Sequence, residues 1–306
     1  MRDGLRTRLG IMACAVLLVF VAGCGNPGGV DGDLTNGWGP MAPASGFEPT
    51  AGTCHSANFA TAAARSTYEE IGCDLQHRTE TVYVGTYDSP AADADEPPAD
   101  GSAGARSAYD TCDDQTTKYV GGPWRNARLW IGVTHPTTPA WAGGSRWFRC
   151  EVLELSSVED DGGVVQRTGS LRNALSNGSS DLLLTCYVIQ LDNAGTIQNM
   201  PPVGCTARHN AEYAGTWYAG DDLDYPKNDP DWTKFHDGCR KLIATYVGVP
   251  DDADLQYRTG VVSLPGGEDV WALGDHGVRC YLWLDGAGLT GSLKGKGPKS
   301  LPVQYK

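Results

Sequence analysis

The chain has 306 residues, a formal net charge of −13, 9% aromatic residues and ten cysteines. A chain this acidic lacks the basic surface that phosphate backbones require, so its charge argues against nucleic acid as a partner. We expect a protein of ordinary domain-sized units in a compartment where disulfides persist.

A secretory leader opens the sequence. Arg2, Arg6 and Arg8 precede the apolar run "IMACAVLLVFVAGC", which is shorter than the roughly 20 residues of a membrane span. The end of the run, "VAGC", resembles a bacterial lipobox, in which Cys24 becomes the mature N-terminus and carries diacylglycerol. We predict a lipoprotein signal peptide over 1–23 and a lipid anchor on Cys24 at the extracytoplasmic face of the cell membrane. An ordinary secreted protein is the alternative.

Residues 24–46 are rich in glycine and proline and predict a flexible tether. Loss of the signal, with three arginines and one aspartate, removes a charge of +2 and leaves the mature chain near −15. Two acidic, proline-containing stretches, 88–102 and 220–231, predict solvated loops. A calcium site is the alternative for each, although neither has the spacing of a calcium-binding loop.

The remainder of the chain contains one unit twice. The offset is 132 residues for Cys54/Cys186, Cys73/Cys205, His77/His209 and Glu80/Glu212. It becomes 127 for Cys112/Cys239 and Tyr119/Tyr246, 130 for Trp141/Trp271 and Cys150/Cys280, and 122 for Thr168/Thr290. Each step falls in a polar segment, where a loop changes length at little cost. The sequence therefore predicts two homologous domains, 47–178 and 181–303.

Eight cysteines remain once Cys14 and Cys24 are set aside, four in each domain. None forms a CxxC pair, which disfavours zinc-ribbon and thioredoxin interpretations. Four cysteines allow three connectivities within a domain. We favour first with second and third with fourth, which gives Cys54–Cys73, Cys112–Cys150, Cys186–Cys205 and Cys239–Cys280.

The first domain predicts a helix over 107–121 and strands over 127–136 and 146–155. Polar Thr116 and Thr117 weaken the apolar face of this helix, and the repeat is its main support. In the second domain, strands are expected over 181–191, 211–220, 255–264 and 277–284. The helix of the second domain, 229–248, has one apolar face, with Asp229 as its cap, Pro230 in its first turn and Gly248 at its end.

The order strand, strand, helix, strand, strand predicts an α+β fold. Each disulfide-stabilised domain would be a small antiparallel sheet with one packed helix, and the helical cysteine would be bonded to the last strand.

The repeated Cys-x3-His-x2-Glu pattern allows several interpretations. A nucleophilic cysteine must be a free thiolate, whereas Cys73 and Cys205 each have an equivalent partner at constant spacing, which favours disulfides. His77 and Glu80, with His209 and Glu212, could supply four metal ligands, but residues three apart in an extended segment point to opposite faces unless a turn intervenes. A structural role near the sheet edge is favoured. A partner-binding surface made of the same residues, taken as exposed, is the remaining interpretation.

This pattern, preceded by a cysteine in a short strand and followed by a helical cysteine and a "W…RC" strand, resembles the septum-formation domain family of bacterial envelope proteins. The resemblance covers both copies. It implies membrane-associated, extracytoplasmic modules with a link to cell division, and it implies no established reaction.

Other signs of catalysis are weak, because the sequence contains none of the common hydrolase, metalloprotease or P-loop motifs. His55, His135, His236 and His276 do not repeat and are interpreted as surface or capping residues. Unpaired Trp38, Trp124 and Trp130 are candidates for a binding surface. We expect a protein that is not an enzyme and has no cofactor, whose partner is an envelope or division protein or the cell wall; an envelope hydrolase or a metal-binding protein is the alternative.

Overall fold

Two β-sheets, one in each half of the chain, form the framework of the protein. The computed structural model describes residues 38–39, 46–159, 162–286 and 288–304. The signal peptide, Cys24 and most of the tether lie outside the described residues. Among the helices that the structure describes, none is long and apolar enough to cross a membrane.

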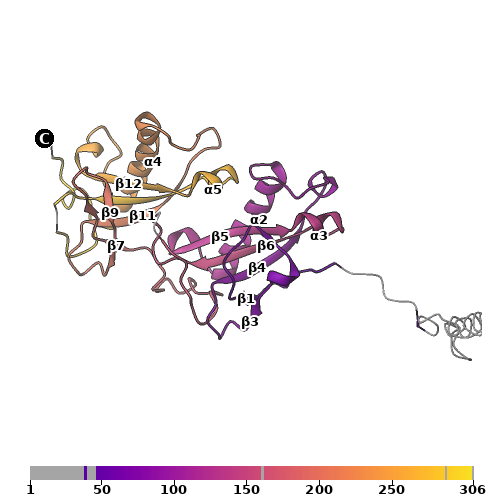
Figure 1. The fold of residues 1–306 in the computed structure, drawn as a ribbon. Helices are drawn as coiled ribbons and strands as arrows, with labels where there is room; N and C mark the ends of the chain where they lie inside the picture. The colour runs from indigo at the N-terminus through magenta and orange to yellow at the C-terminus, as the bar shows by residue number, and fades with distance from the viewer. Residues whose placement is uncertain (1–37, 40–45, 160–161, 287, 305–306) are drawn as a thin grey trace, which may run out of the picture. The chain divides into compact units, whose positions relative to one another are not determined.

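The first half is a six-stranded sheet with α2 packed on it (Figure 1). Its elements are β1 (Thr53–His55), β2 (Ala62–Ala63), β3 (Glu70–Ile71), β4 (Thr79–Thr86), α2 (Ala103–Val120), β5 (Leu129–Pro136), α3 (Thr138–Ala142) and β6 (Trp147–Glu154). The spatial order is β2-β5-β6-β4-β1-β3, and the pairs are antiparallel apart from β2 with β5. The expected antiparallel sheet with one packed helix is therefore present, with a short parallel strand added at one edge.

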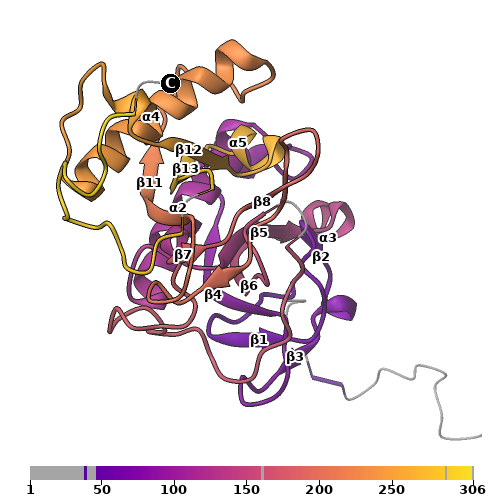
Figure 2. The ribbon, with the colours of Figure 1, turned by 90° about the vertical axis from the view of Figure 1, so that its left-hand side faces the viewer.

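The second half repeats this plan. Its elements are β7 (Cys186–Tyr187), β8 (Gln190–Leu191), β9 (Ile197–Asn199), β10 (Pro202–Val203), β11 (Ala211–Tyr218), α4 (Asp229–Val247), β12 (Gly260–Pro265), α5 (Glu268–Ala272) and β13 (Gly277–Trp283). Strands β10-β7-β11-β13-β12 form an antiparallel sheet that α4 covers (Figure 2). Strand β8 pairs separately with β9. The strand expected over 181–191 is broken into two short pieces, and residues 255–257 form a 3-10 turn before β12.

Both long helices begin after a residue whose side chain caps the first turn, and both end at a glycine. Ser102 caps α2 by accepting from the amide of Ala105, and Asn228 caps α4 by accepting from the amide of Asp231. Asp229 is thus the first helical residue rather than the predicted cap. Gly121 and Gly248 end the helices at φ +81° and +83°, a conformation that glycine adopts without strain.

The four disulfides have the predicted connectivity: Cys54–Cys73, Cys112–Cys150, Cys186–Cys205 and Cys239–Cys280. The second and fourth bonds join α2 to β6 and α4 to β13, and all four of these sulfurs are fully buried. Each helix is therefore fixed to the last strand of its sheet at the centre of its own core.

Residues 46–306 form one compact unit, within which the two halves meet through polar groups. Buried Arg125 donates to Asp275 at 2.6 and 2.9 Å and to Asp113 at 2.7 Å. Tyr109 of α2 also donates to Asp275, at 2.9 Å, and Arg279 of β13 donates to the carbonyls of Arg125 and Leu129. Segments about 150 residues apart in sequence are joined by these bonds.

Candidate functional site

The repeated histidine and glutamate meet in both halves. The turn after Cys73 brings His77 to the start of β4, where its Nε2 lies 3.1 Å from Oε1 of Glu80. The corresponding distance between His209 and Glu212 is 3.2 Å. A turn thus places two residues that would diverge in a continuous strand on the same side of the sheet, facing the helix.

Each carboxylate is surrounded by the histidine and by three further donors, which come from segments distant in sequence. Glu80 accepts from the hydroxyl of Tyr119 (3.0 Å), the hydroxyl of Ser170 (2.8 Å) and the amide of Leu171 (2.7 Å). Glu212 accepts from Tyr246 (2.7 Å), Ser292 (2.8 Å) and the amide of Leu293 (2.9 Å). We call each set of histidine, glutamate, tyrosine and serine a carboxylate cluster. The repeated tyrosine and the repeated "TGSL" segment, 168–171 and 290–293, therefore bind the same carboxylate as the repeated histidine.

The donors in each cluster keep their protons. Burial, reinforced by the glutamate charge, raises the pKa of Tyr119 and of Tyr246 above the ordinary tyrosine value. Nδ1 of His77 lies 2.9 Å from the carbonyl oxygen of Leu75, which only accepts, so Nδ1 carries a proton. Partners on both ring nitrogens and on the carboxylate explain how these polar side chains remain fully buried.

These clusters do not fit a metal centre or a nucleophilic site. Cys54, His77 and Glu80, like Cys186, His209 and Glu212, place their ligand atoms within 4.8 Å of one another. However, both cysteine sulfurs belong to disulfides, both imidazole nitrogens are engaged, and the carboxylate lone pairs accept from protein donors. A metal would have to displace protons and donors already in place.

The prediction that these four side chains form an exposed interaction surface is wrong. His77 and His209 are each 1% exposed, and Glu80 and Glu212 are fully buried. Their position under the helix, rather than at the rim of the sheet, accounts for the difference. Trp124 is also buried, at 2% exposure, because its ring lies beside Arg125 and its indole NH donates to Asp113.

His55 was expected at the surface and is instead 2% exposed, on the face of the sheet opposite α2. Its Nε2 lies 2.8 Å from Oγ1 of Thr81, which donates to Glu151 at 2.7 Å; Arg149 lies 2.9 Å from the same carboxylate oxygen. We call these four residues the His55 cluster. Burial, with a smaller contribution from Arg149, lowers the pKa of His55 to about 4, and burial raises the pKa of Glu151.

Three members of the His55 cluster are replaced in the second half, whereas the fourth, Arg149, aligns with Arg279. The offsets of 132 and 130 align His55, Thr81 and Glu151 with Tyr187, Tyr213 and Tyr281, whose rings contact one another with both centroid distances at 5.3 Å. The position is therefore interior in both halves, filled by polar groups in one and by aromatic rings in the other. The tyrosine at the aligned position is the signal that could have revealed the burial of His55.

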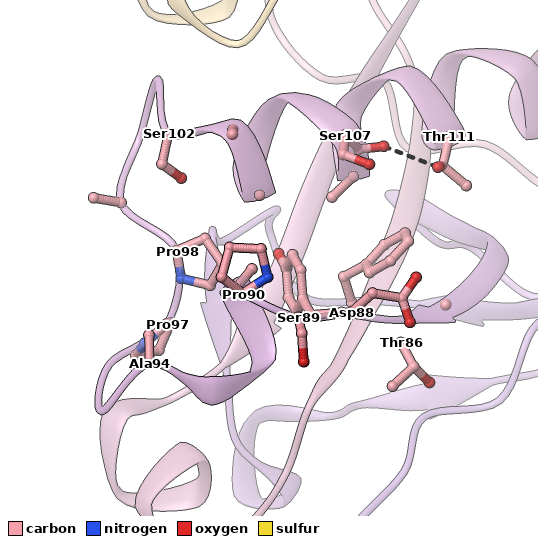
Figure 3. A pocket seen from close by; sticks show the side chains of 18 of the residues that line it. Thr86, Asp88, Ser89, Pro90, Ala94, Pro97, Pro98, Ser102, Ser107 and Thr111 are labelled. Carbon is pink, nitrogen blue, oxygen red and sulfur yellow. Dashed lines mark hydrogen bonds between the residues drawn. The ribbon is translucent and has the colours of Figure 1, made fainter.

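A cavity of about 740 Å³ opens beside the first sheet (Figure 3). Its floor is formed by β4, Phe148 and α2, and its outer wall by the loop 88–102. This loop was predicted as a solvated segment, with a calcium site as the alternative. Its acidic side chains are exposed, whereas its three prolines and three of its four alanines line the cavity. The volume lies within the range of small-molecule binding sites.

Comparison with known proteins bears on this architecture. The family model described as Septum formation matches residues 51–280, which is more than half of the chain and extends across both halves. No curated protein and no solved structure gives a match. The family assignment therefore rests on the region that holds all four disulfides and both buried glutamates, and on that ground the chain belongs to the Septum formation family.

Proposed function

We propose that this protein is a lipid-anchored lipoprotein of the extracytoplasmic face of the membrane, which contributes to septum formation by binding a partner rather than by catalysis. Family membership supports the link to the septum. The four disulfides support an oxidising compartment, and the "VAGC" sequence supports lipid on Cys24.

The proposal that the protein is not a catalyst rests on one observation: the polar atoms of the two carboxylate clusters are buried and bonded within the protein. Catalysis requires a group that can reach a substrate and exchange a proton or an electron pair with it. The repeated histidines have both ring nitrogens engaged within the protein, and the neighbouring sulfurs are oxidised. The most conspicuous repeated residues thus stabilise the fold, which leaves the surface and the cavity for function.

Anchoring is tested by metabolic labelling with an alkyne fatty acid in cells that express the wild type, Cys24→Ala or Cys14→Ala. We expect the wild type and Cys14→Ala to carry the label and sediment with membranes, and Cys24→Ala to do neither. Label retained on Cys24→Ala would contradict the anchor.

The role in division is tested by depletion of the protein in its natural host, with septa imaged by fluorescent cell-wall labelling. We expect longer cells with fewer septa, restored by the wild type. A doubly substituted protein with Glu80→Gln and Glu212→Gln, checked for folding by circular dichroism, should also restore them. Unchanged septa after depletion would refute the proposal. Failure of the folded double variant, or stoichiometric zinc or copper in purified protein, would favour an enzyme or a metal-binding protein.

A further inference from the structure

We propose that the cavity beside β4 and α2 binds an aromatic ring that carries a positive charge nearby. A small aromatic amine and an aromatic side chain flanked by lysine or arginine on a polypeptide both carry this chemistry. This inference rests on the binding role proposed above and identifies the site and the ligand chemistry.

The second half of the protein shows which side chains occupy the corresponding position there. The offset of 132 aligns Gly85 of β4 with Trp217 of β11, and the offset of 127 aligns Thr111 of α2 with Gly238 of α4. A Cβ atom on Gly238 would lie 2.4 Å from the indole of Trp217, so the indole lies directly against the helix. The first half has no side chain at Gly85, and both Gly85 and Thr111 line the cavity.

A second exchange enlarges the same space. Phe235, which is 1% exposed and lies 5.9 Å from Trp217 between ring centroids, aligns with Ala108 of α2, another residue of the cavity lining. Phe148 fills part of the space left by these two exchanges, because its ring lies over Gly85. Its counterpart in β13 is the smaller Val278. One aromatic side chain thus remains on the floor, where it can stack with a ring that enters from solvent.

The outer wall of the cavity is held in place by the protein itself. The indole NH of Trp141 donates to the carbonyl of Ala94 at 2.8 Å, and Arg146, stacked on Trp141, donates to the carbonyl of Ala92. The second half uses the same arrangement, in which Trp271 donates to the carbonyl of Leu223 at 3.2 Å. The cavity is therefore formed before a ligand arrives, which reduces the entropy lost on binding.

The charges around the cavity select the sign of the ligand. Asp88 and Glu96 are charged lining residues, and both are exposed at the rim; among the residues that the structure describes, no lysine, arginine or histidine lines the cavity. Asp93, Asp95 and Asp100 add negative charge to the same loop. An acidic rim above an aromatic and aliphatic floor attracts a cation whose uncharged part can be buried, and it repels phosphates and carboxylates.

Fluorine NMR of fluorinated probes with the purified full mature chain provides the test, because the probe signal is independent of the protein's own tryptophans. The probes are 5-fluorotryptamine, the peptide N-acetyl-Lys-(5-fluoro-Trp)-Lys-amide, and 5-fluoroindole-3-acetate. We expect saturable binding of the amine, of the peptide or of both, with the acetate weaker by about tenfold and the difference reduced at high salt. Binding of the peptide alone would identify a polypeptide source, and binding of the amine alone a small molecule.

Substitutions locate the binding. Thr111→Trp places an indole in the cavity and should abolish binding of the amine and the peptide. Thr245→Trp is the control, because Thr245 is a helical threonine that donates to the carbonyl four residues earlier, as half-buried Thr111 does, but it is exposed and lies outside the cavity lining. Asp88→Asn and Glu96→Gln, which alter only the rim, should each weaken binding about threefold.

Absence of binding by both cationic probes, or binding that Thr111→Trp leaves unchanged, would overturn the inference. The failure of this inference is distinguishable from failure of the proposed function. A chain that binds neither probe but restores septa after depletion loses the ligand assignment alone, whereas normal septa after depletion remove the division role whatever the probes show.

Discussion

Glu80 and Glu212 illustrate how a single buried carboxylate can organise a small domain. Each accepts hydrogen bonds from a histidine, a tyrosine hydroxyl, a serine hydroxyl and a backbone amide, contributed by the strand, the helix and the closing segment. Loss of the acceptor takes the hydrogen-bond partner from the buried histidine and the buried backbone amide, whereas the tyrosine and serine hydroxyls of each cluster remain 3.1 Å from each other. The carboxylate therefore joins segments that hydrophobic contact alone would position less specifically.

Replacement of this acceptor should be costly and nearly equal in the two halves. We expect Glu80→Ala and Glu212→Ala each to lower the free energy of unfolding by about 3–5 kcal/mol, since each leaves buried donors without a partner. Urea denaturation followed by circular dichroism measures the loss. Glu70→Ala, at an exposed position of β3, is the control and should change the value by less than about 0.5 kcal/mol. A loss below about 1 kcal/mol at both buried sites would contradict the assigned role.

His55 makes stability depend on pH in a defined window. The pKa of His55 is about 4 in the folded chain, against 6.5 for an imidazole exposed to water. Between these two pH values the unfolded chain binds more protons than the folded chain, so acid favours unfolding. The contribution is complete above pH 6.5 and is lost as the pH falls toward 4. The raised pKa of Glu151 acts in the opposite direction, because the folded chain then binds protons more readily than the unfolded chain.

We expect His55→Gln to remove this acid sensitivity. Between pH 7 and pH 4 the wild type should lose on the order of 2 kcal/mol relative to the variant, and the contribution of Glu151 cancels in the comparison to first order. Urea unfolding of both proteins across this range checks the difference. Parallel curves for the two proteins would show that His55 does not titrate between these limits.

Sequence reasoning at the residue scale succeeded where the repeat supplied a second copy. The repeat marked His77, Glu80 and Tyr119 as special, but nothing in the sequence joined them, because Tyr119 lies 39 residues from Glu80 and reaches it only once α2 covers the sheet. Burial was missed for the same reason. Polar residues at the start of a strand are usually exposed, and only the tertiary position of the helix reverses this expectation.

At the scale of elements, the disulfides divide into two functional types. Cys54–Cys73 and Cys186–Cys205 close segments of 19 residues within the strands and turns, whereas Cys112–Cys150 and Cys239–Cys280 join helix to sheet across 38 and 41 residues. The loop-entropy model assigns about 3 kcal/mol to the shorter bridges and about 4 kcal/mol to the longer ones. The longer bridges also fix the helix that supplies the tyrosine of each carboxylate cluster.

Removal of a helix-to-strand bridge should therefore disturb the cluster as well as the stability. We expect the paired substitution Cys112→Ala with Cys150→Ala to cost about 4 kcal/mol and to increase amide exchange near Glu80. Cys239→Ala with Cys280→Ala should do the same near Glu212, and each pair serves as the control for the other. Equal exchange rates near Glu80 with and without its bridge would show that the two features are independent.

Helix α4 and the last strands were predicted well because their signals are local, as in the apolar face that runs the length of α4. Helix α2 was predicted mainly from the repeat, and it begins at Ala103 rather than at the predicted 107; neither cap, Ser102 or Asn228, was predicted. The short helices α3 and α5 were not predicted, since five residues carry too little periodicity to be detected. The cavity was also beyond reach, because it depends on how the loop 88–102 folds back onto α2.

The whole molecule is more than two independent repeats. Arg125 in the first half lies between Asp113 of its own half and Asp275 of the other, and all three groups belong to segments that differ between the copies. Burial lowers and the charge of Asp275 raises the pKa of Arg125, with a net increase, so the guanidinium stays charged. A charged group that bonds to both halves couples their unfolding, because unfolding of either half leaves a buried charge in the other without its partner.

Arg125→Ala should weaken this coupling more than it weakens either half. Because Asp275 would remain buried without its cation, we expect a loss of about 3–5 kcal/mol and the separation of one calorimetric unfolding transition into two. Lys227→Ala, which removes an exposed ion pair with Glu268 in the second half, is the control and should leave the transition single and its temperature unchanged. Should Arg125→Ala also unfold in one transition at the wild-type temperature, the halves must be held together by the remaining contacts between them, among them the bonds that Tyr109 and Arg279 donate, rather than by Arg125.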